Sequence, residues 1–275
     1  MSKMIRIGLL VLCLGYSNLM LAAVPLTGRV QHMIYSRAQV QKYAAVAYHR
    51  HIASLADKGE LDNNPAALQR VRRICSRLIA QAIRLKPIAA HWAWEVHITS
   101  DPDVAAYSMA GGKILVGTHF LARYKLSDNE LAVVLGHEIG HVIAEHVREQ
   151  VSMAASFNKS LPPRSRKVAD VVSAMQSDIS VYLRLQPLSR LQEMEADDIG
   201  IELAARAGIP PSAILSFYSK LARHDRGNVS IFNSHGSIAQ RVRFVDSMAS
   251  YAGPVYRASR RARLLPNYRF ATASH

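Results

Sequence analysis

The sequence contains very little cysteine. Only Cys13 and Cys75 occur among its 275 residues, and Cys13 lies in an N-terminal stretch that we predict to be removed. With Cys75 alone remaining, no intramolecular disulfide can form, even in an oxidising compartment. The fold must therefore depend on its hydrophobic core and on any metal that it binds.

Acidic residues are also scarce. The chain has 20 Asp and Glu against 34 Lys and Arg, a net charge of +14, and removal of Lys3 and Arg6 would lower that charge by 2. Much of the excess lies in residues 70–86 and 257–269. No recognisable nucleic-acid-binding motif accompanies it, so we expect no nucleic acid partner. An anionic membrane surface is the better partner, and a solvated basic face that only aids solubility is the alternative.

Long hydrophobic runs are absent. The chain begins with Lys3 and Arg6, continues with a short apolar run at residues 7–14, and reaches small residues at Ala22 and Ala23. These are the three parts of a secretory signal peptide, whereas a membrane-spanning helix needs about 20 apolar residues. We therefore predict a signal peptide at residues 1–23 that exports the rest of the chain. An uncleaved membrane anchor is the alternative.

The remaining residues, 24–275, contain no internal repeat and no low-complexity tract. The chain is 49% hydrophobic, enough to bury one substantial core, so we predict a single domain with a basic tail at 254–275. Helical periodicity dominates, period-two alternation marks a strand at 91–99, and two short strands joined by a glycine pair follow it. The expected fold is α+β, mainly helical with one small β-sheet. Helices are expected at 36–56, 65–85, 118–124, 127–150, 165–185, 190–207, 212–224 and 237–251, and strands at 91–99, 104–110 and 113–117.

Residues 127–150 carry the clearest functional pattern. Ser127 and Glu130 have the spacing of a capping box, and the apolar residues after them recur at helical intervals, so a helix begins here. Inside it, His137 and His141 belong to an H-E-x-x-H pattern. Four positions on a helix place the two imidazoles ~40° apart, on one face, where both can reach one metal ion. Glu138 lies beside them, and the arrangement is typical of zinc hydrolases.

Two alternatives compete with a zinc site. The first is a buried helix that carries two histidines by chance. The second is a di-iron carboxylate site, because Glu138 and His141 form one E-x-x-H unit. Such sites need a second E-x-x-H unit on another helix, and the sequence has none.

A catalytic zinc site needs a third protein ligand and an open position. On the predicted helix at 190–207, Glu193 and Asp197 share one face. We predict that Glu193 is the third ligand and that Asp197 supports the site by orienting a ligating histidine through its other ring nitrogen. His146 would lie ~180° from His137 on a continuous helix, so we expect it to bond within the core. Solvent exposure is expected for the other acidic residues of this helix, which are Glu195, Asp198 and Glu202.

Together these patterns resemble the gluzincin metallopeptidases of the HtpX and OMA type, which include the CAAX prenyl endopeptidase and periplasmic quality-control proteases. The resemblance rests on H-E-I-G-H with His146 five residues on, and on S-R-L-Q-E-M-E-A-D-D-I-G, where Glu193 and Asp197 match the family's E-x-x-x-D motif. It covers roughly residues 107–245. It implies a zincin-type domain with one Zn²⁺ per chain, held by His137, His141 and Glu193.

The resemblance also implies a substrate-binding strand. The family has a strand that ends in two glycines, followed by a second strand ahead of the metal helix, and residues 107–116 look similar. An edge strand there would bind an extended peptide by strand addition. This chain departs from its relatives at Ala105 and Ala110, where they usually show asparagine and often proline. The substrate-binding residues implied by this match are Gly112, Lys113, Ile114 and Leu115.

Residues 234–241 are similar to the family's His-Pro stretch, with Gly236 in place of the proline. By this match His235 would stabilise the oxyanion or touch the metal, and Arg241 would support the cleft.

The resemblance implies a periplasmic zinc endopeptidase that hydrolyses peptide bonds of misfolded or unassembled envelope proteins. Glu138 would act as general base on a metal-activated water. A membrane-anchored form facing the periplasm is the alternative location. A periplasmic chaperone or assembly factor, with zinc as a structural or regulatory element, is the alternative function.

Overall fold

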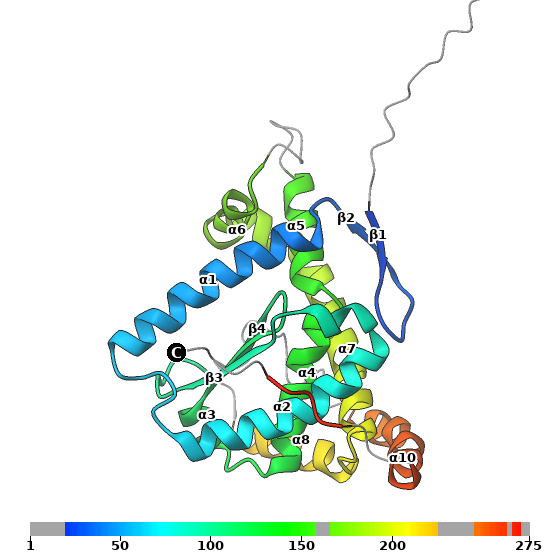
Figure 1. Cartoon of the computed structure of the whole chain (residues 1–275). Helices are drawn as coiled ribbons and strands as arrows, with labels where there is room; N and C mark the ends of the chain where they lie inside the picture. The colour runs from blue at the N-terminus through cyan, green and yellow to red at the C-terminus, as the bar shows by residue number, and fades with distance from the viewer. Residues whose placement is uncertain (1–19, 158–165, 225–244, 263–265, 271–275) are drawn as a thin grey trace, which may run out of the picture.

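The computed structural model describes residues 20–157, 166–224, 245–262 and 266–270. They form the expected mainly helical α+β domain, in which helices surround a small mixed sheet (Figure 1). The helices are α1 (Arg37–Asp57), α2 (Pro65–Leu85), the 3₁₀ helix η1 (Pro87–His91), α3 (Thr118–Arg123), α4 (Asp128–Ile143), α5 (His146–Phe157), α6 (Val168–Ser177), α7 (Ile179–Arg206), α8 (Ser212–His224) and α10 (Val245–Arg261). The strands are β1 (Met20–Ala23), β2 (Val30–Met33), β3 (Glu95–Thr99), β4 (Ala106–Met109) and β5 (Lys113–Gly117).

The three-stranded sheet has the order β3-β5-β4. The central strand β5 runs parallel to β3 and antiparallel to β4, and every one of its residues is buried. Both of its edges are therefore occupied. Lys113, Ile114 and Leu115 of β5 therefore offer no free edge to a peptide, because an added strand needs an unpaired edge. The assignment of these residues and of Gly112 to substrate binding stays a prediction. Strands β3 and β4 are the edge strands of this sheet, and β3 also pairs with Leu61 through an isolated bridge at Thr99.

A second sheet, the hairpin of β1 and β2, was not expected from the sequence. Its register pairs Leu21 with His32 and Ala23 with Val30. The prediction of a signal peptide at 1–23 places the cleavage site at the end of β1. Cleavage there would remove β1 and leave β2 attached to the domain.

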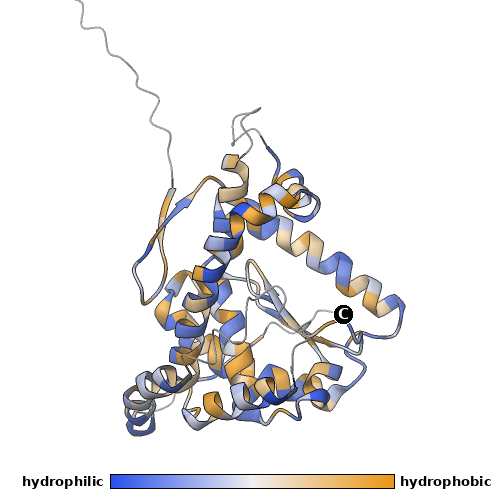
Figure 2. Cartoon of the chain, turned by 180° about the vertical axis from the view of Figure 1, so that it is seen from behind, coloured by the Kyte–Doolittle hydropathy of each residue, from blue (hydrophilic) through white to orange (hydrophobic). Residues whose placement is uncertain are grey.

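The main hydrophobic core lies between α2, the sheet, α4, α7 and α8. Helix α2 contributes an apolar stripe that includes Val71, Cys75 and Leu78, and Trp94 packs beside it with its indole N–H donated to the Ala89 carbonyl oxygen. Helix α1 crosses outside the sheet and shows alternating hydrophilic and hydrophobic bands, as a helix with one buried face should (Figure 2). None of the described helices is both long and apolar enough to cross a membrane.

Helices α4 and α7 cross in direct backbone contact at the centre of the domain. A Cβ atom added to Gly200 would lie 2.5 Å from the His137 backbone nitrogen, and one added to Gly136 would lie 2.6 Å from the Gly200 carbonyl oxygen. A Cβ on Gly140 would lie 2.8 Å from the Ala196 carbonyl oxygen. Atoms cannot approach this closely without displacement, so only glycine permits the crossing. The crossing places the H-E-x-x-H turn of α4 against Glu193 of α7.

The helix predicted at 127–150 is divided into α4 and α5. Ala144 ends α4, and Glu145 adopts a left-handed conformation with φ of 57° before α5 begins at His146. A non-glycine residue in this conformation is unfavourable by itself. Here the Glu145 carboxylate is buried and forms ion pairs with Arg37, Lys86 and Arg148. These ion pairs stabilise the bend.

The opposite deviation occurs in α7. We expected a break at Pro187 and a new helix from residue 190, but α7 continues from Ile179 to Arg206 with the proline inside it. Proline removes the hydrogen bond to the carbonyl of the residue four positions earlier, here Leu183. Both Pro187 and Leu183 are exposed, so water can hydrate that carbonyl.

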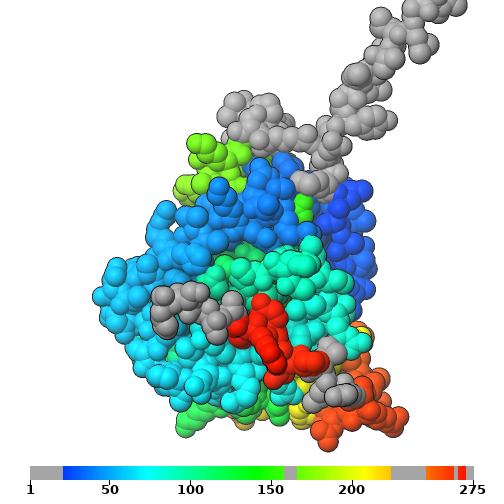
Figure 3. All heavy atoms as spheres, in the orientation of Figure 1, coloured from blue at the N-terminus to red at the C-terminus, as the bar shows by residue number. Residues whose placement is uncertain are grey.

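Much of the predicted basic tail at 254–275 lies against the domain. Its first part continues α10 to Arg261, and residues 266–270 lie across the face formed by α2 (Figure 3). The Tyr268 amide donates to the Ser76 carbonyl oxygen at 3.0 Å, and the Ser76 hydroxyl donates to the Tyr268 carbonyl oxygen.

We predict that Gly200→Ala lowers the free energy of unfolding by about 1–3 kcal/mol, because the new methyl group forces α4 and α7 apart. Gly253→Ala is the matched control, since Gly253 also lies in a helix but its Cβ would meet only Arg257 Nη1 at 3.4 Å. Alanine there should raise stability by up to about 1 kcal/mol. Urea unfolding of the metal-free proteins measures both, and equal stability of the two variants would contradict the close crossing.

The start of α4 generates a pH prediction. Burial opposes ionisation of Glu130, but hydrogen bonds from Lys220, Ser216 and Ser127 lower its pKa to about 2. The unfolded chain keeps the ordinary value of 4.5. The unfolded state therefore binds more protons between these values, and the contribution of Glu130 to stability is lost as pH falls from about 4.5 to about 2.

Glu130→Gln should flatten the acid side of the stability profile in this window. Unfolding free energies from pH 5 to pH 2 test this expectation, and a variant whose acid profile has the same slope as the parent would contradict it.

Candidate metal centre

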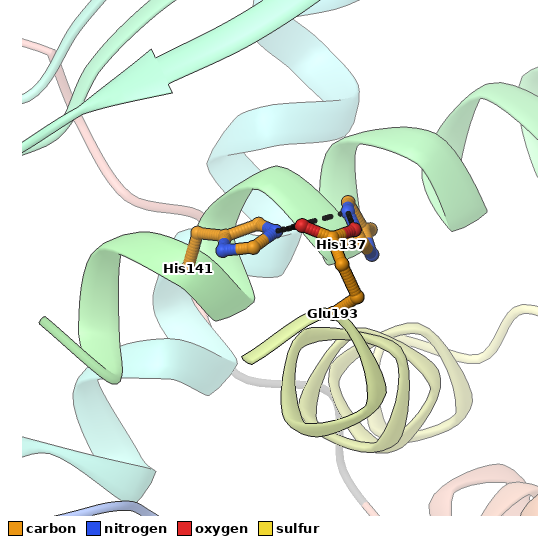
Figure 4. A group of neighbouring side chains, drawn as sticks. All are labelled: His137, His141 and Glu193. Atoms are coloured by element: carbon orange, nitrogen blue, oxygen red, sulfur yellow. Dashed lines mark hydrogen bonds and ion pairs between the residues drawn. The ribbon is translucent and has the colours of Figure 1, made fainter. Parts of the chain in front are cut away.

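Three side chains meet at the crossing of α4 and α7. His137 and His141 extend from adjacent turns of α4, and Glu193 rises from α7 toward both imidazoles (Figure 4). The two Nε2 atoms lie 3.1 Å apart, and each is 3.4 Å from an oxygen of the Glu193 carboxylate. The structure thus brings together the three residues predicted as metal ligands. In the part of the chain that the structure describes, they are the one group of three or more such residues whose ligand atoms cluster in this way.

The donor atoms fit zinc in type and in spacing. Zinc in catalytic sites takes histidine nitrogen and carboxylate oxygen at about 2.0–2.1 Å, in a tetrahedron whose edges are therefore about 3.3–3.4 Å. The two Nε2 atoms, 3.1 Å apart, are close to such an edge, and each lies 3.4 Å from a different oxygen of the Glu193 carboxylate, with one ligand atom of each residue within 4.8 Å of the others. The three residues could hold one zinc ion and leave a fourth position for a water or a substrate oxygen.

His137 is oriented by a carboxylate, as the sequence predicts. Its Nδ1 lies 2.9 Å from Asp197 Oδ1, one helical turn beyond Glu193 on the same face of α7. The Tyr218 hydroxyl, from α8, donates to the same oxygen at 3.2 Å. A proton held on Nδ1 leaves the lone pair of Nε2 for a metal, so Asp197 selects the tautomer that can be a ligand.

His141 is supported differently, and this support was missed. Its Nδ1 lies 2.9 Å from Nδ1 of His146, whose Nε2 lies 3.2 Å from Glu195 Oε2. His146 and Glu195 are both buried. The expectation that His146 bonds within the core is correct but incomplete, because its partner is a predicted ligand. The angular argument assumed a continuous helix, whereas the bend at Glu145 turns His146 toward His141.

The expectation that Glu195 and Glu202 face solvent is wrong. They are only 3% and 2% exposed, whereas Asp198 is exposed as expected. Glu202 accepts an ion pair from Arg206. Glu195 is covered by the β1–β2 hairpin, whose Arg29 donates Nε to one of its oxygens at 2.7 Å and Nη2 to the other at 2.9 Å.

The same guanidinium also binds Glu149 of α5, at 2.5 Å from Nη1 and 2.7 Å from Nη2. Gln31 and Gln192 add donors to Glu149 at 2.9 and 2.8 Å. Two buried carboxylates therefore share one arginine, which compensates their charge.

The electrostatics of the centre favour neutral imidazoles beside ionised carboxylates. Burial lowers the pKa of His141 to about 3, although the hydrogen bond that its ring donates to Glu193 acts in the opposite direction. Burial also lowers the pKa of His146. Burial opposes ionisation of Glu195, yet hydrogen bonds from Arg29 and His146 lower its pKa to about 2. Neutral histidine and ionised carboxylate are the forms that bind metal.

Glu138 follows His137 on α4 and is buried. The Ser108 hydroxyl of β4 donates to its backbone carbonyl at 3.0 Å, so this turn of the helix faces the edge strand. A small hollow, partly open to solvent, lies beside His141. Its lining includes Trp92 of the segment after η1, Met109 of β4 and Val142 of α4.

The roles predicted for His235 and Arg241 lie outside the described residues. They remain predictions from the resemblance.

Comparison with known proteins points to the same chemistry. Residues 65–249 match Peptidase family M48. The chain is 37% identical over 157 residues to the mitochondrial metalloendopeptidase OMA1 of Arabidopsis thaliana, covering 57% of this chain and 30% of OMA1. It is 32% identical over 155 residues to the metalloprotease LoiP of Escherichia coli, covering 55% of this chain and 61% of LoiP. It is 30% identical over 206 residues to the metalloprotease YcaL of the same organism, covering 72% of this chain and 80% of YcaL.

The chain thus spans less than two thirds of OMA1 and of LoiP. The matched region contains the α4–α7 crossing, while α1 and the β1–β2 hairpin lie before it.

We predict that Asp197→Ala weakens zinc binding about 10–100-fold, because His137 loses the carboxylate that fixes its ring. Asp198→Ala is the control, since it removes the neighbouring carboxylate from the exposed face of the same helix. Competition with a chromogenic chelator measures both affinities. If the two variants bound zinc equally well, Asp197 would have no orienting role.

Proposed function

The chain belongs to peptidase family M48, and we propose that it is an exported zinc-dependent endopeptidase that cleaves misfolded or unassembled envelope proteins. The observation that carries the proposal is the cluster of His137, His141 and Glu193, whose donor atoms are of the types that catalytic zinc binds and lie within 4.8 Å of one another. The H-E-x-x-H residue Glu138 adjoins this cluster on α4.

The metal and the side chains would each supply a different part of the proposed chemistry. Bound zinc would supply Lewis acidity, which acidifies a water and polarises a peptide carbonyl. Glu138 would accept the proton of the attacking water and later deliver it to the amine of the leaving peptide. Asp197 and His146 would hold the imidazoles of His137 and His141 in their ligating orientations.

The edge strand β4 is the proposed docking site for the substrate backbone. It is the strand beside α4, joined to it by the Ser108 hydroxyl, and its outer edge is unpaired within the sheet. An extended peptide adding to β4 would pass the metal centre. The hollow lined by Trp92, Met109 and Val142 beside His141 would take an apolar side chain of that peptide.

This binding mode favours unfolded substrates. Strand addition requires an extended segment with free backbone donors and acceptors, which folded proteins rarely expose. The envelope location rests on the predicted signal peptide at residues 1–23, with its charged, apolar and small-residue parts.

We predict that Glu138→Gln lowers casein hydrolysis about 10²–10⁴-fold and leaves zinc bound, since glutamine cannot accept a proton. Glu202→Gln is the control, because it also replaces a buried glutamate but lies away from the metal centre and pairs with Arg206.

Hydrolysis by the parent and the control, with zinc in all three proteins, is the expected result. Parent-level hydrolysis by Glu138→Gln would overturn the assignment of the base. Zinc in the parent without hydrolysis of any unfolded substrate would overturn the endopeptidase proposal and favour a holding function.

A further inference from the structure

One chain of contacts runs from the N-terminal hairpin to a predicted metal ligand. Arg29, which precedes β2, binds the Glu195 carboxylate through two nitrogens. Glu195 lies 3.2 Å from His146 Nε2, and His146 Nδ1 lies 2.9 Å from His141 Nδ1. Three side chains, those of Arg29, Glu195 and His146, thus connect the hairpin to His141.

We propose that Arg29 and Glu195 are positioning residues of the metal centre, acting through His146 to hold His141 in its ligating orientation. The inference rests on the metal site of the proposed function and extends it to a segment before the region that matches the family, residues 65–249. Arg29 and β2, which remain after the predicted cleavage at residue 23, would then be part of the catalytic unit.

The hydrogen-bonding capacity of imidazole fixes the direction of this relay. His141 presents Nε2 toward Glu193 and His137, so a metal would use that nitrogen and the ring proton must reside on Nδ1. That N–H donates to His146 Nδ1, which must therefore be the acceptor nitrogen of a neutral ring. The His146 proton then resides on Nε2 and is donated to Glu195. Each of the two rings therefore has one tautomer that satisfies all of its hydrogen-bond partners.

The two ligating histidines are consequently supported in unequal ways. His137 contacts its carboxylate, Asp197, directly. His141 is linked to its carboxylate, Glu195, only through His146. The position of Glu195 therefore affects the orientation of His141 indirectly, by orienting His146. Arg29 fixes that position, because its two bonds leave the Glu195 carboxylate no freedom to rotate.

A purely structural role for Arg29 is the alternative. It joins the hairpin to Glu149 of α5 and Glu195 of α7, and its loss would leave two buried carboxylates without their shared cation. A structural role lowers the stability of the metal-free protein but does not alter zinc affinity once the protein is folded. The positioning role alters both.

The test measures zinc affinity by chelator competition and the melting temperature of the metal-free protein, on the full chain. Arg29→Met and Glu195→Gln should each weaken zinc binding about tenfold. Arg29→Lys serves as a second variant if Arg29→Met does not fold. It keeps the positive charge but cannot make the two hydrogen bonds to Glu195, so it should also weaken zinc binding. Arg70→Met is the matched control: Arg70 has a similar exposure and anchors α4 through Asp128 and the Leu126 carbonyl, far from the relay.

Zinc affinity in the folded Arg29 and Glu195 variants that equals that of Arg70→Met would overturn the proposal. Weaker zinc binding in these variants, with Arg70→Met at the parent affinity, would support it.

A pair of substitutions at His146 tests the middle of the relay. His146→Asn can place an acceptor oxygen near the position of Nδ1, whereas His146→Leu cannot. We expect about 10–100-fold weaker zinc binding in the leucine variant and partial recovery in the asparagine variant. Equal losses in both variants would contradict a hydrogen-bonded relay.

Long-range nitrogen–proton NMR spectra of the zinc-loaded parent should show His141 protonated on Nδ1 and His146 on Nε2. The reverse tautomer of His146 would also overturn the proposal. None of these readouts depends on hydrolysis, so a parent that binds zinc but cleaves nothing would refute the proposed function and leave the relay test intact.

Discussion

The close crossing of α4 and α7 is the constraint on which the rest of this structure depends. Packed helices usually keep their axes 8–10 Å apart because side chains separate them. Here Gly136, Gly140 and Gly200 remove the side chains at the contact, and backbone meets backbone. Only at that separation can a glutamate of α7 bring its carboxylate within 3.4 Å of both imidazoles of α4.

Around this crossing, elements distant in sequence supply the groups that orient the ligands. Helix α8 contributes Tyr218 to the Asp197 side, and the bend at Glu145 turns His146 toward His141. The hairpin covers the opposite side of α7 with Arg29. A buried cluster of charged and polar groups is costly unless every member is paired, so the hairpin, α5 and α7 stabilise one another only when assembled together.

The sequence predicted the parts of the site that depend on a single helix. The capping box at Ser127 and Glu130 marked the start of α4, and helical spacing placed His137 with His141 and Glu193 with Asp197. It failed where a second element decides the environment. Glu195 lies on a face that would be exposed on an isolated helix, and nothing in the local sequence says that a hairpin covers it.

The order of the strands in the sheet could not be predicted from the sequence either. Three short strands were recognised, but their pairing places β5 in the centre and β4 at the edge, so the strand that looked suited to bind substrate is closed on both sides. Glu145 and Pro187 show that the surroundings override local preference. Ion pairs to Glu145 favour a bend within a strong helical pattern, while exposure of Leu183 and Pro187 lets α7 continue through a proline.

The most direct measurement of the central claim is the zinc K-edge X-ray absorption spectrum of the purified, zinc-loaded protein. The account predicts one zinc per chain with the scattering of two imidazoles and with carboxylate oxygen, at about 2.0–2.1 Å. Replacement of Glu193 by alanine should remove the outer-shell scattering of the carboxylate carbon and keep both imidazoles and the oxygen of bound water. A spectrum without imidazole scattering, or one that is unchanged in the Glu193→Ala protein, would contradict the claim that the α4–α7 crossing builds the metal centre.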